Sequence, residues 1–374
     1  MRKIIFGITS LTLGGAERVL VDLVNKMSEK FDITVFMLYS NGELEAELND
    51  KIHIKTVYDK KYVELTTKEK ILASFNVLWN KKKIFKKYVD NEEYIAQIAF
   101  LEGAITRIFS VKSNRKTKKI AWVHNDMTKV FGKGIKAKMK KRMDEKAYQK
   151  YDNIIFVSRD NLKAFDSFYK NVNQPEKNII KNYLNAERIL NLSKETSEYK
   201  NIYQENEINM LQVSRLVEQK AIDRLMKVHA NLLQKGIRIH IYVIGEGPLK
   251  EKLQKQIVDL KLEDTFTLLG AKKNPYPYIK DADVFGLFSY FEGYGMVIEE
   301  AKILKRYVII TDTAAREALK DYEKYSYIVS NDEKGVEKAI QYIAEKGKQM
   351  REEDIEYTYK NEEIINKITS IIEE

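Results

Sequence analysis

Cysteine is absent from this 374-residue sequence, and tryptophan and proline are scarce, with two and four residues. Without cysteine the chain can form no disulfide framework, no thiolate nucleophile and no thiolate-ligated metal site. Long apolar runs are missing too, since no segment approaches the roughly eighteen apolar residues that a membrane-spanning helix needs. These absences exclude a disulfide-stabilised scaffold and a helical integral membrane protein, and they favour a chain that works in a reducing cytoplasm.

Apolar residues and basic clusters dominate what is present. The chain is 44% apolar and 11% aromatic, with a net charge of +10. That composition can fill two hydrophobic cores, and the chain is longer than a single core usually organises. Charge alone does not decide the partner, but the lysine clusters all fall in the first half, at Lys81 to Lys87, Lys112 to Lys119 and Lys133 to Lys146.

The first half alternates short apolar runs with helical patterns. The chain begins with a short apolar run, Arg2 to Ile8, which is followed by a turn-forming glycine pair, Gly14-Gly15. The next segment, Ala16 to Met27, has apolar residues at helical spacing, and a second apolar run follows at Phe31 to Leu38. No secretory leader is expected, because this helical pattern continues past the glycines. Further strand-like runs lie at Tyr94 to Ala99, Ile120 to Val123 and Ile154 to Val157. The pattern predicts a parallel α/β domain over residues 1–185.

The second half repeats this organisation after a polar stretch, Asn185 to Glu207, which predicts a connection. Its strand-like runs are Ile208 to Val213, Ile237 to Ile244, Thr265 to Leu269, Val284 to Phe288, Tyr307 to Thr311 and Tyr327 to Val329. We predict a second doubly wound domain over residues 186–350. A C-terminal helix over 351–374 is expected to pack back on the first domain.

The loop after the run Val284 to Phe288 carries the most informative motif. It reads Ser289-Tyr290-Phe291-Glu292-Gly293-Tyr294-Gly295 and leads into a helix that contains Glu300. Ligands of open parallel sheets bind outside the carboxyl ends of the strands. Glycines allow the backbone to approach a ligand closely, and the free amides at a helix N-terminus favour the binding of an anion. Two carboxylates beside a phosphate also require hydroxyl groups to hydrogen-bond, which a sugar and a ribose supply.

The motif Ser-x-x-Glu-Gly-aromatic-Gly-x-x-x-x-Glu-Ala resembles the signature of glycosyltransferase family 4 and its GT-B relatives. The resemblance implies a fold of two Rossmann-like domains that face a central cleft, with the acceptor bound by the first and a nucleotide-sugar donor by the second. It also implies that Glu292 lies against the donor sugar and that Glu300 holds the nucleotide ribose. The expected donor-binding backbone positions in this motif are Gly293, Tyr294, Gly295, Met296 and Val297.

A second segment is similar to the same family. A strand-like run is followed by Ser214-Arg215-Leu216 and then by Lys220. In the family, the matching Arg and Lys bind the donor diphosphate. A forked guanidinium and a compact ammonium suit a pyrophosphate. Ala221 departs from the family's glycine. The turn Gly245-Glu246-Gly247-Pro248 matches the family's Gly-x-Gly-Pro, which by itself indicates only a tight turn.

Two matches lie in the first half. Gly15, in the first strand-to-helix loop, resembles a family glycine near the donor phosphates and the acceptor. His124 follows the run Ile120 to Val123 and matches a histidine that many members place near the reacting centre. The catalytic residues implied by the resemblance are Glu292, His124, Arg215 and Lys220.

The resemblance implies metal-independent transfer with retention of configuration. Asp281-Ala282-Asp283 formally matches the Asp-x-Asp metal site of other glycosyltransferases, but it precedes a strand instead of following one, so we expect no metal or other cofactor. The donor is expected to be UDP-linked, and the acceptor a glycan or lipid-linked sugar of capsule, exopolysaccharide or cell-wall polymer synthesis. Alternatives are a nucleotide-sugar epimerase or glycosidic phosphorylase of the same fold, or a non-enzymatic nucleic-acid-binding protein.

An apolar stripe in the third lysine cluster bears on whether the enzyme works at a membrane surface. Ile135, Met139, Met143 and Ala147 recur every four residues among lysines, a pattern typical of a membrane-surface helix and equally of a helix packed on its own domain. With the other lysine clusters it favours a cytoplasmic enzyme, peripheral on the inner face of the cell membrane. We expect an anionic membrane surface, and no nucleic acid, as the macromolecular partner.

Overall fold

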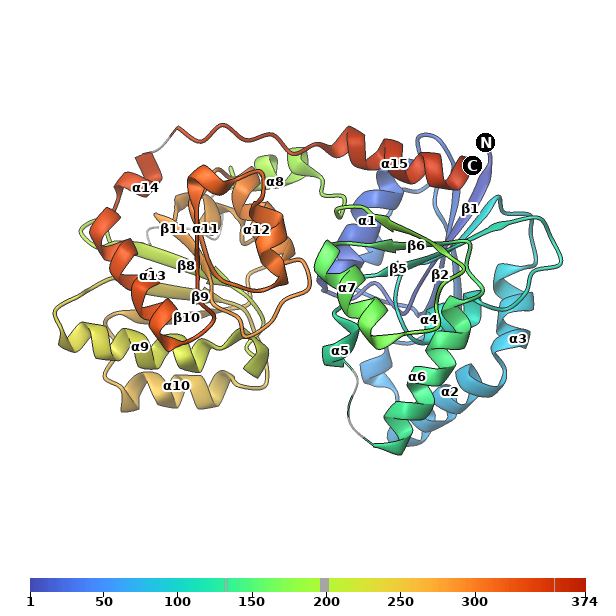
Figure 1. The fold of residues 1–374 in the computed structure, drawn as a ribbon, viewed down its shortest axis with the longest axis horizontal. Helices are drawn as coiled ribbons and strands as arrows, with labels where there is room; N and C mark the ends of the chain where they lie inside the picture. Colours follow the sequence, from blue (N-terminus) through green and yellow to red (C-terminus); the bar gives the residue numbers. More distant parts are fainter. Residues whose placement is uncertain (131, 133, 196–201, 353) are drawn as a thin grey trace. The chain divides into compact units, whose positions relative to one another are not determined.

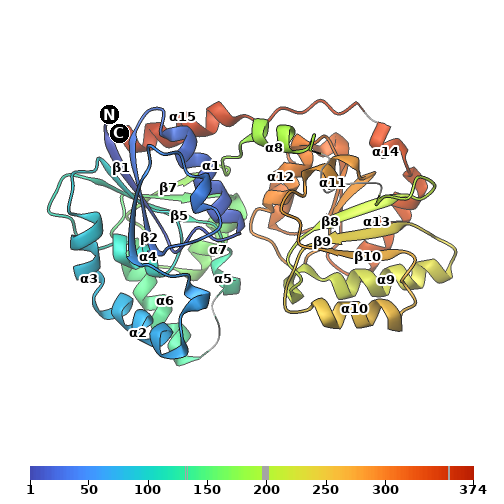
Figure 2. The ribbon, with the colours of Figure 1, turned by 180° about the vertical axis from the view of Figure 1, so that it is seen from behind.

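The computed structural model describes residues 1–130, 132, 134–195, 202–352 and 354–374. The chain forms two compact units, Met1–Asn185 with Lys360–Glu374, and Ala186–Tyr359. Each unit has its own parallel sheet, of seven strands in the first and six in the second. Figures 1 and 2 show helices on both faces of each sheet. The α/β class with two doubly wound sheets, predicted from the alternating runs, is confirmed.

The sheet of the first unit has the order β3-β2-β1-β4-β5-β6-β7, and every neighbouring pair is parallel. The strand order reverses between β1 and β4. The strands are β1 (Lys3–Ile8), β2 (Asp32–Tyr39), β3 (His53–Tyr58), β4 (Ala96–Ala99), β5 (Lys118–Val123), β6 (Asn153–Phe156) and β7 (Glu176–Ile179).

Two of these strands, β3 and β7, were not predicted. Both are edge strands, and their side chains are exposed or half-buried. The central strands are buried on both faces and therefore read as continuous apolar runs. An edge strand needs no such run, so β3 and β7 leave no comparable signal in the sequence.

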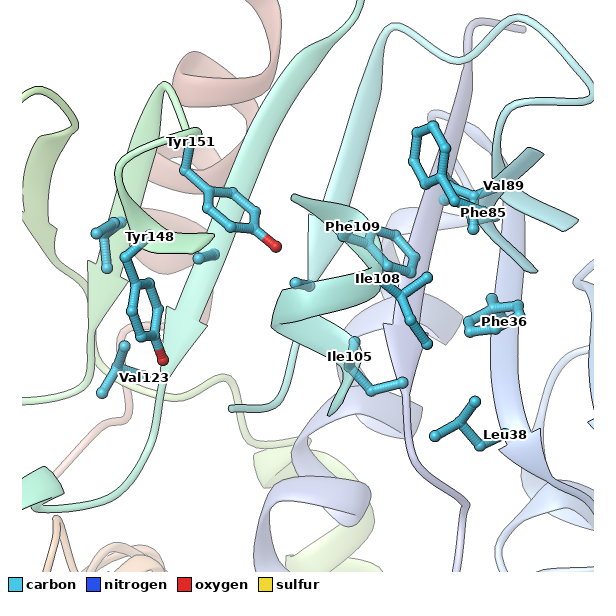
Figure 3. Close-up of a cluster of buried hydrophobic side chains, with 14 of the residues drawn as sticks. Phe36, Leu38, Phe85, Val89, Ile105, Ile108, Phe109, Val123, Tyr148 and Tyr151 are labelled. Carbon is cyan, nitrogen blue, oxygen red and sulfur yellow. The ribbon is translucent and has the colours of Figure 1, made fainter. Parts of the chain in front are cut away.

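The helices of the first unit cover a large apolar core. They are α1 (Gly15–Met27), α2 (Thr67–Trp79), α3 (Lys81–Ile84), α4 (Ala104–Phe109), α5 (Met127–Val130), α6 (Ile135–Tyr148), α7 (Arg159–Phe168) and α15 (Asn361–Glu373). Figure 3 shows part of this core, in which α4 contributes Ile105, Ile108 and Phe109 opposite Phe36 of β2. The core fixes the carboxyl ends of β1, β4 and β5, where the candidate site residues of this unit lie.

The second unit has the strand order β10-β9-β8-β11-β12-β13, again all parallel. The strands are β8 (Asn209–Val213), β9 (His240–Ile244), β10 (Phe266–Gly270), β11 (Val284–Leu287), β12 (Val308–Thr311) and β13 (Ser326–Val329). Each predicted run of this half coincides with one of them. The helices are α8 (Ala186–Leu192), α9 (Ile222–Gln234), α10 (Lys250–Asp259), α11 (Tyr276–Asp281), α12 (Met296–Ile303), α13 (Glu333–Lys346) and α14 (Gln349–Glu352).

Two expectations about the ends of this unit need correction. The polar stretch Asn185 to Glu207 is not all connection, because α8 lies within it; residues 196–201 of the stretch lie outside the described residues. The C-terminal helix does not begin near residue 351: α14 ends at Glu352, residues 354–360 are not helical, and α15 begins at Asn361.

Helix α15 belongs to the first unit, although it is last in the chain. Its apolar face is buried through Ile364, Ile365, Ile368, Ile371 and Ile372. Across the ranges described above, no helix combines the length and the apolar character needed to cross a membrane.

Burial of α15 makes it a structural part of the first unit. Ile368 is 1% exposed, so Ile368→Ala should lower the free energy of unfolding by about 2–5 kcal/mol through lost burial and a residual cavity. The matched control is Asn366→Ala on the exposed side of the same helix, which should change it by less than about 0.5 kcal/mol. Urea denaturation measures both. Equal effects of the two substitutions would contradict the assigned packing.

Candidate functional site

The strand order of the second unit reverses between β8 and β11, which pair directly. In doubly wound sheets such a reversal opens the space between the loops that follow the two strands, and ligands bind there. The loop after β8 contains Arg215 and Lys220, and the loop after β11 contains Glu292. The two motifs singled out in the second half of the sequence therefore lie at one edge of one sheet.

Glu292 and Lys220 form the central contact between these loops. Lys220 Nζ donates to Glu292 Oε1 at 2.5 Å, and Ser289 Oγ donates to the same oxygen at 2.5 Å. The side chains of Glu292 and Lys220 are only 7% and 14% exposed. An ion pair at this depth is weakly screened and has a fixed geometry, unlike a solvated surface pair.

Further hydrogen bonds hold the two loops together. Tyr290 N–H donates to the carbonyl of Gln219 at 2.9 Å, and Gln219 Nε2 donates to the carbonyl of Phe291 at 2.8 Å. From α9, Arg224 donates to the carbonyl of Phe288 at 2.7 Å, and its guanidinium lies 4.5 Å from the centre of the Tyr290 ring. Arg224 is thus a support for the loop after β11 that sequence reasoning did not identify.

Helix α12 begins at the same edge. Gly295 caps it in the left-handed conformation, with φ 75°, where a side chain would be strained. A Cβ at this position would also lie 2.9 Å from Ile298. The helix N-terminus that follows presents the positive end of its dipole to an anion. Glu300 lies on α12, half-buried, and Tyr276 Oη donates to its Oε1 at 3.4 Å.

Tyr294 contributes to this edge only through its backbone. Its side chain is 4% exposed, and its hydroxyl donates to Glu299 Oε1 at 2.5 Å. Glu299 also accepts from Tyr357 and pairs with the fully buried Lys302 at 2.8 Å. Burial raises the pKa of Tyr294 well above its usual range, and the charge of Glu299 adds to that effect. Glu299 is therefore a structural carboxylate, whereas its neighbour Glu300 is only half-buried.

Arg215 is exposed in the loop after β8, and the Gly-Glu-Gly-Pro turn after β9 fixes that loop. An added Cβ would come within 1.9 Å of the Ser214 carbonyl oxygen at Gly245, and within 2.4 Å of the Leu216 oxygen at Gly247. Leu216 N–H donates to the carbonyl of Glu246 at 2.9 Å. The two glycines are thus required by close backbone packing, and the turn positions the segment that carries Arg215.

The Asp-x-Asp sequence lies at the amino end of β11, away from this edge. Asp283 is 1% exposed and accepts hydrogen bonds from the backbone N–H and the Nδ2 of Asn209, at 2.8 and 3.1 Å. It ties β8 to β11. Within the described residues, no group of three or more histidine or acidic side chains is arranged to hold a metal ion.

Gly15 and His124 lie in the first unit, after β1 and β5. Gly15 is the exposed first residue of α1. Glu102, in the loop after β4, accepts from the backbone N–H groups of His124 and Asn125 at 2.7 and 2.8 Å, and Asn161 Nδ2 donates to the His124 carbonyl at 3.0 Å. Glu102 therefore holds the His124 loop, and its only sequence signal is its position directly after an apolar run.

The imidazole of His124 lies among aromatic rings. Its centroid is 4.7 Å from that of Phe100 and 6.0 Å from that of Trp122. Burial lowers the pKa of His124 to about 3, and a hydrogen bond with the Phe100 backbone opposes this only in part. The ring is therefore neutral at physiological pH, so one of its nitrogens donates a hydrogen bond and the other can accept one.

Each unit thus gathers its own predicted residues. The second brings Arg215, Lys220, Glu292 and Glu300 to the carboxyl edge of β8 and β11, with the N-terminus of α12. The first places Gly15 and His124 at the carboxyl edge of β1 and β5. The arrangement in the second unit suits a phosphorylated ligand that also carries hydroxyl groups.

Comparisons with known proteins agree with this architecture. Residues 193–361 match the family described as Glycosyl transferases group 1. An uncharacterized glycosyltransferase from Methanocaldococcus jannaschii is 32% identical over 220 residues, which cover 58% of this chain and 53% of that protein. The chain therefore aligns with about half of that relative.

A second relative aligns over most of both chains. The N-acetylgalactosamine-N,N'-diacetylbacillosaminyl-diphospho-undecaprenol 4-alpha-N-acetylgalactosaminyltransferase from Campylobacter jejuni is 27% identical, and the alignment covers 86% of this chain and 85% of that enzyme. The crystal structure of Anabaena HepE in complex with UDP-glucose superposes with a TM-score of 0.72 at 15% identity, covering 99% of this chain and all of that one.

Two Rossmann-like units with this site edge define the GT-B class of fold. Residues 193–361, which carry this site edge, match the group 1 glycosyl transferases, a family of retaining enzymes also called glycosyltransferase family 4. The family resemblance drawn from the Glu292 and Arg215 motifs is confirmed.

The neutral state of His124 predicts a specific pH dependence of stability. The folded pKa, about 3, is below the ordinary value of 6.5, so the unfolded chain binds a proton that the native state does not. The stabilisation is complete above pH 6.5 and is lost as the pH falls from 6.5 toward 3. His124→Gln should lessen the acid-induced loss of unfolding free energy by up to about 1.4 kcal/mol per pH unit. Parallel pH curves for both proteins would contradict this.

Proposed function

We propose that the protein transfers a sugar, with retention of configuration, from a nucleotide-sugar donor bound by the second unit to an acceptor bound by the first. The observation that carries the proposal is the buried Lys220–Glu292 pair, between the two loops at the carboxyl ends of β8 and β11. The pair lies beside the N-terminus of α12. This edge of the sheet thus supplies positive charge that can bind a diphosphate, and beside it a carboxylate that can bind hydroxyl groups.

The donor diphosphate is bound by Arg215, Lys220 and the first amides of α12, those of Met296 and Val297. An ammonium has three donors, so Lys220 keeps its bond to Glu292 while it contacts phosphate. Negative charge develops on the leaving phosphate oxygen during transfer, and prearranged donors stabilise that charge without reorganisation. In this proposal these residues carry out the electrostatic part of catalysis, with no metal ion required.

The donor sugar and ribose are held by the two carboxylates. Glu292 Oε1 already accepts bonds from Lys220 and Ser289, so we assign Oε2 to a sugar hydroxyl. Glu300 is assigned to the ribose hydroxyls. The backbone of Gly293 and Gly295 allows the sugar ring and phosphates to approach closely.

The first unit receives the acceptor in this proposal. His124 is uncharged and held by Glu102 through its backbone, so its role is to orient the sugar or acceptor with one hydrogen bond, not to supply charge. From the family resemblance we also assign Gly15 to donor binding. The acceptor hydroxyl attacks from the face that the diphosphate leaves, and the departing phosphate takes its proton. No protein nucleophile is needed.

The relatives support a UDP-linked donor and a lipid-linked or glycan acceptor. HepE was crystallised with UDP-glucose, and the Campylobacter jejuni enzyme adds N-acetylgalactosamine to a sugar on diphospho-undecaprenol. A relative from Erwinia amylovora, 27% identical over 125 residues, is an amylovoran biosynthesis glycosyltransferase. We therefore propose a role in capsule, exopolysaccharide or cell-wall polymer synthesis, in the cytoplasm and peripherally on the inner face of the cell membrane.

The two glutamates should separate binding from turnover. A panel of nucleotide sugars tested for thermal protection first identifies the donor, since a true donor stabilises the native state. With that donor, Glu300→Gln should raise the dissociation constant roughly tenfold, and Glu292→Gln should mainly lower kcat, by roughly tenfold to a hundredfold. Titration calorimetry and initial rates measure these effects.

The control for the glutamates is Glu251→Gln, an exposed carboxylate on α10 of the same unit, which should alter neither constant. Wild-type rates and affinities in both Glu292→Gln and Glu300→Gln would rule out the assigned donor site. Interconversion of the free sugar nucleotide without any acceptor would instead identify an epimerase.

Metal independence is a separate expectation. Arg215, Lys220 and the α12 N-terminus supply the positive charge, and Asp283 is occupied by Asn209. Transfer should therefore continue at an undiminished rate in excess EDTA, within about twofold of the untreated enzyme, since no divalent ion takes part in the step. Activity lost in EDTA and restored only by Mn²⁺ or Mg²⁺ would show that a metal site had been overlooked.

A further inference from the structure

The outer face of α2 is apolar and exposed. Its inner side packs on the core through the buried Ala73 and the partly buried Val77. Five apolar side chains lie within an arc of roughly 120° on the opposite side, given 3.6 residues per turn. They are Ile71, Leu72, Phe75, Leu78 and Trp79, with exposed fractions of 62%, 59%, 61%, 39% and 71%.

These side chains form one surface. The rings of Phe75 and Trp79 stack, with centroids 5.8 Å apart. Tyr62 and Val63, which precede the helix, are also exposed, at 46% and 76%. A shallow groove continues the surface along Tyr62, Thr67, Lys70, Ile71, Ser74, Phe75 and Leu78. Single exposed apolar residues are ordinary, but a contiguous apolar patch marks a binding surface.

Exposed lysines lie close to this patch along the chain. The exposed lysines beside it are Lys68, Lys82, Lys83, Lys86 and Lys87. Between Thr67 and Lys87 the sequence has a single acidic residue, Glu69, and that carboxylate accepts from the N-cap residue Thr66.

Helix α6 extends the patch. Both α2 and α6 pack against α4, and they lie side by side in Figures 1 and 2. At the start of α6, Ile135 and Met139 are 79% and 59% exposed. They lie among Lys136, Lys138, Lys140 and Arg142, all exposed.

The stripe predicted on α6 is shorter than expected, because Met143 is half-buried and Ala147 is buried. The cluster Lys112 to Lys119 contributes less than expected. Lys119 is buried, donating to Gln97 and to the carbonyls of Phe109 and Val111, and the cluster ends in the first two residues of β5, at the amino ends of the strands. Lys133 of the third cluster lies outside the described residues. The exposed apolar surface is thus centred on α2, whose outer apolar face the sequence pattern did not reveal.

We infer that the outer face of α2, with the start of α6, enters the interfacial region of an anionic lipid bilayer while the surrounding lysines pair with headgroups. Apolar side chains ringed by lysines match such a surface in both hydrophobicity and charge. Two copies of this chain joined through the patch would bring its cations together, which opposes a dimer. The inference rests on the proposed function only in that a lipid-linked acceptor would be presented at this surface.

Trp79 reports directly on insertion. The chain has two tryptophans, and Trp122 is fully buried, so a change of emission on binding must come from Trp79. With phosphatidylglycerol vesicles the emission should shift to shorter wavelength, and brominated acyl chains should quench it. Phosphatidylcholine vesicles should produce neither effect. Trp79→Phe should abolish both changes, because only Trp122 then remains.

Exposed positions also permit substitution without loss of the fold. The double variant Leu72→Ser with Phe75→Ser should bind phosphatidylglycerol vesicles on the order of tenfold to a hundredfold more weakly in sedimentation. Val258→Ser, at an apolar position 55% exposed in the second unit, is the matched control and should bind like the wild type. The unfolding temperatures of all three proteins should agree.

Several outcomes would overturn the inference: no emission shift with anionic vesicles, wild-type vesicle binding by the double variant, or a dimer that the double variant dissociates without any change in vesicle binding. The proposed function is tested separately. Thermal protection by the nucleotide-sugar donor should be the same in wild type and double variant, since α2 and the donor loops belong to different units. Vesicle binding without donor protection would count against the donor site alone.

Discussion

The arrangement of the candidate site in the second unit depends on one buried ion pair between two loops. Lys220 and Glu292 are 72 positions apart in sequence, yet the pairing of β8 with β11 brings their loops to the same sheet edge. A buried pair that loses one partner leaves an uncompensated charge, which is costly. The loops are therefore held in one geometry, and Ser289, Gln219 and Arg224 reinforce it.

The sequence predicted much of this fold because parallel sheets bury their central strands on both faces. Every strand of the second unit and the central strands of the first coincide with apolar runs. The edge strands β3 and β7 were missed because they are not fully buried. The face of α2 was missed for a related reason: the helix is apolar on both its core side and its outer side, which removes the one-sided pattern of an amphipathic helix.

Residues of the candidate site could be proposed from the sequence where local motifs carry them. Glu292, Glu300, Arg215 and Lys220 were found because their spacing belongs to a known family. Their supports are long-range contacts, such as Arg224 with the Phe288 carbonyl and Glu102 with the His124 backbone, and no sequence spacing encodes these. The burial of Tyr294 against Glu299 was equally invisible, because an aromatic residue in a loop motif can face either ligand or core.

Hydrogen–deuterium exchange with and without the donor nucleotide sugar tests the central claim most directly, because backbone amides report where the ligand binds. The account predicts slower exchange in the loops after β8 and β11 and in the first turn of α12, which cover residues 214–220 and 289–298. Exchange near Asp281 and Asp283, at the amino end of β11, should not change. Protection at Asp281 to Asp283, or none at residues 214–220 and 289–298, would contradict the assignment of the donor site.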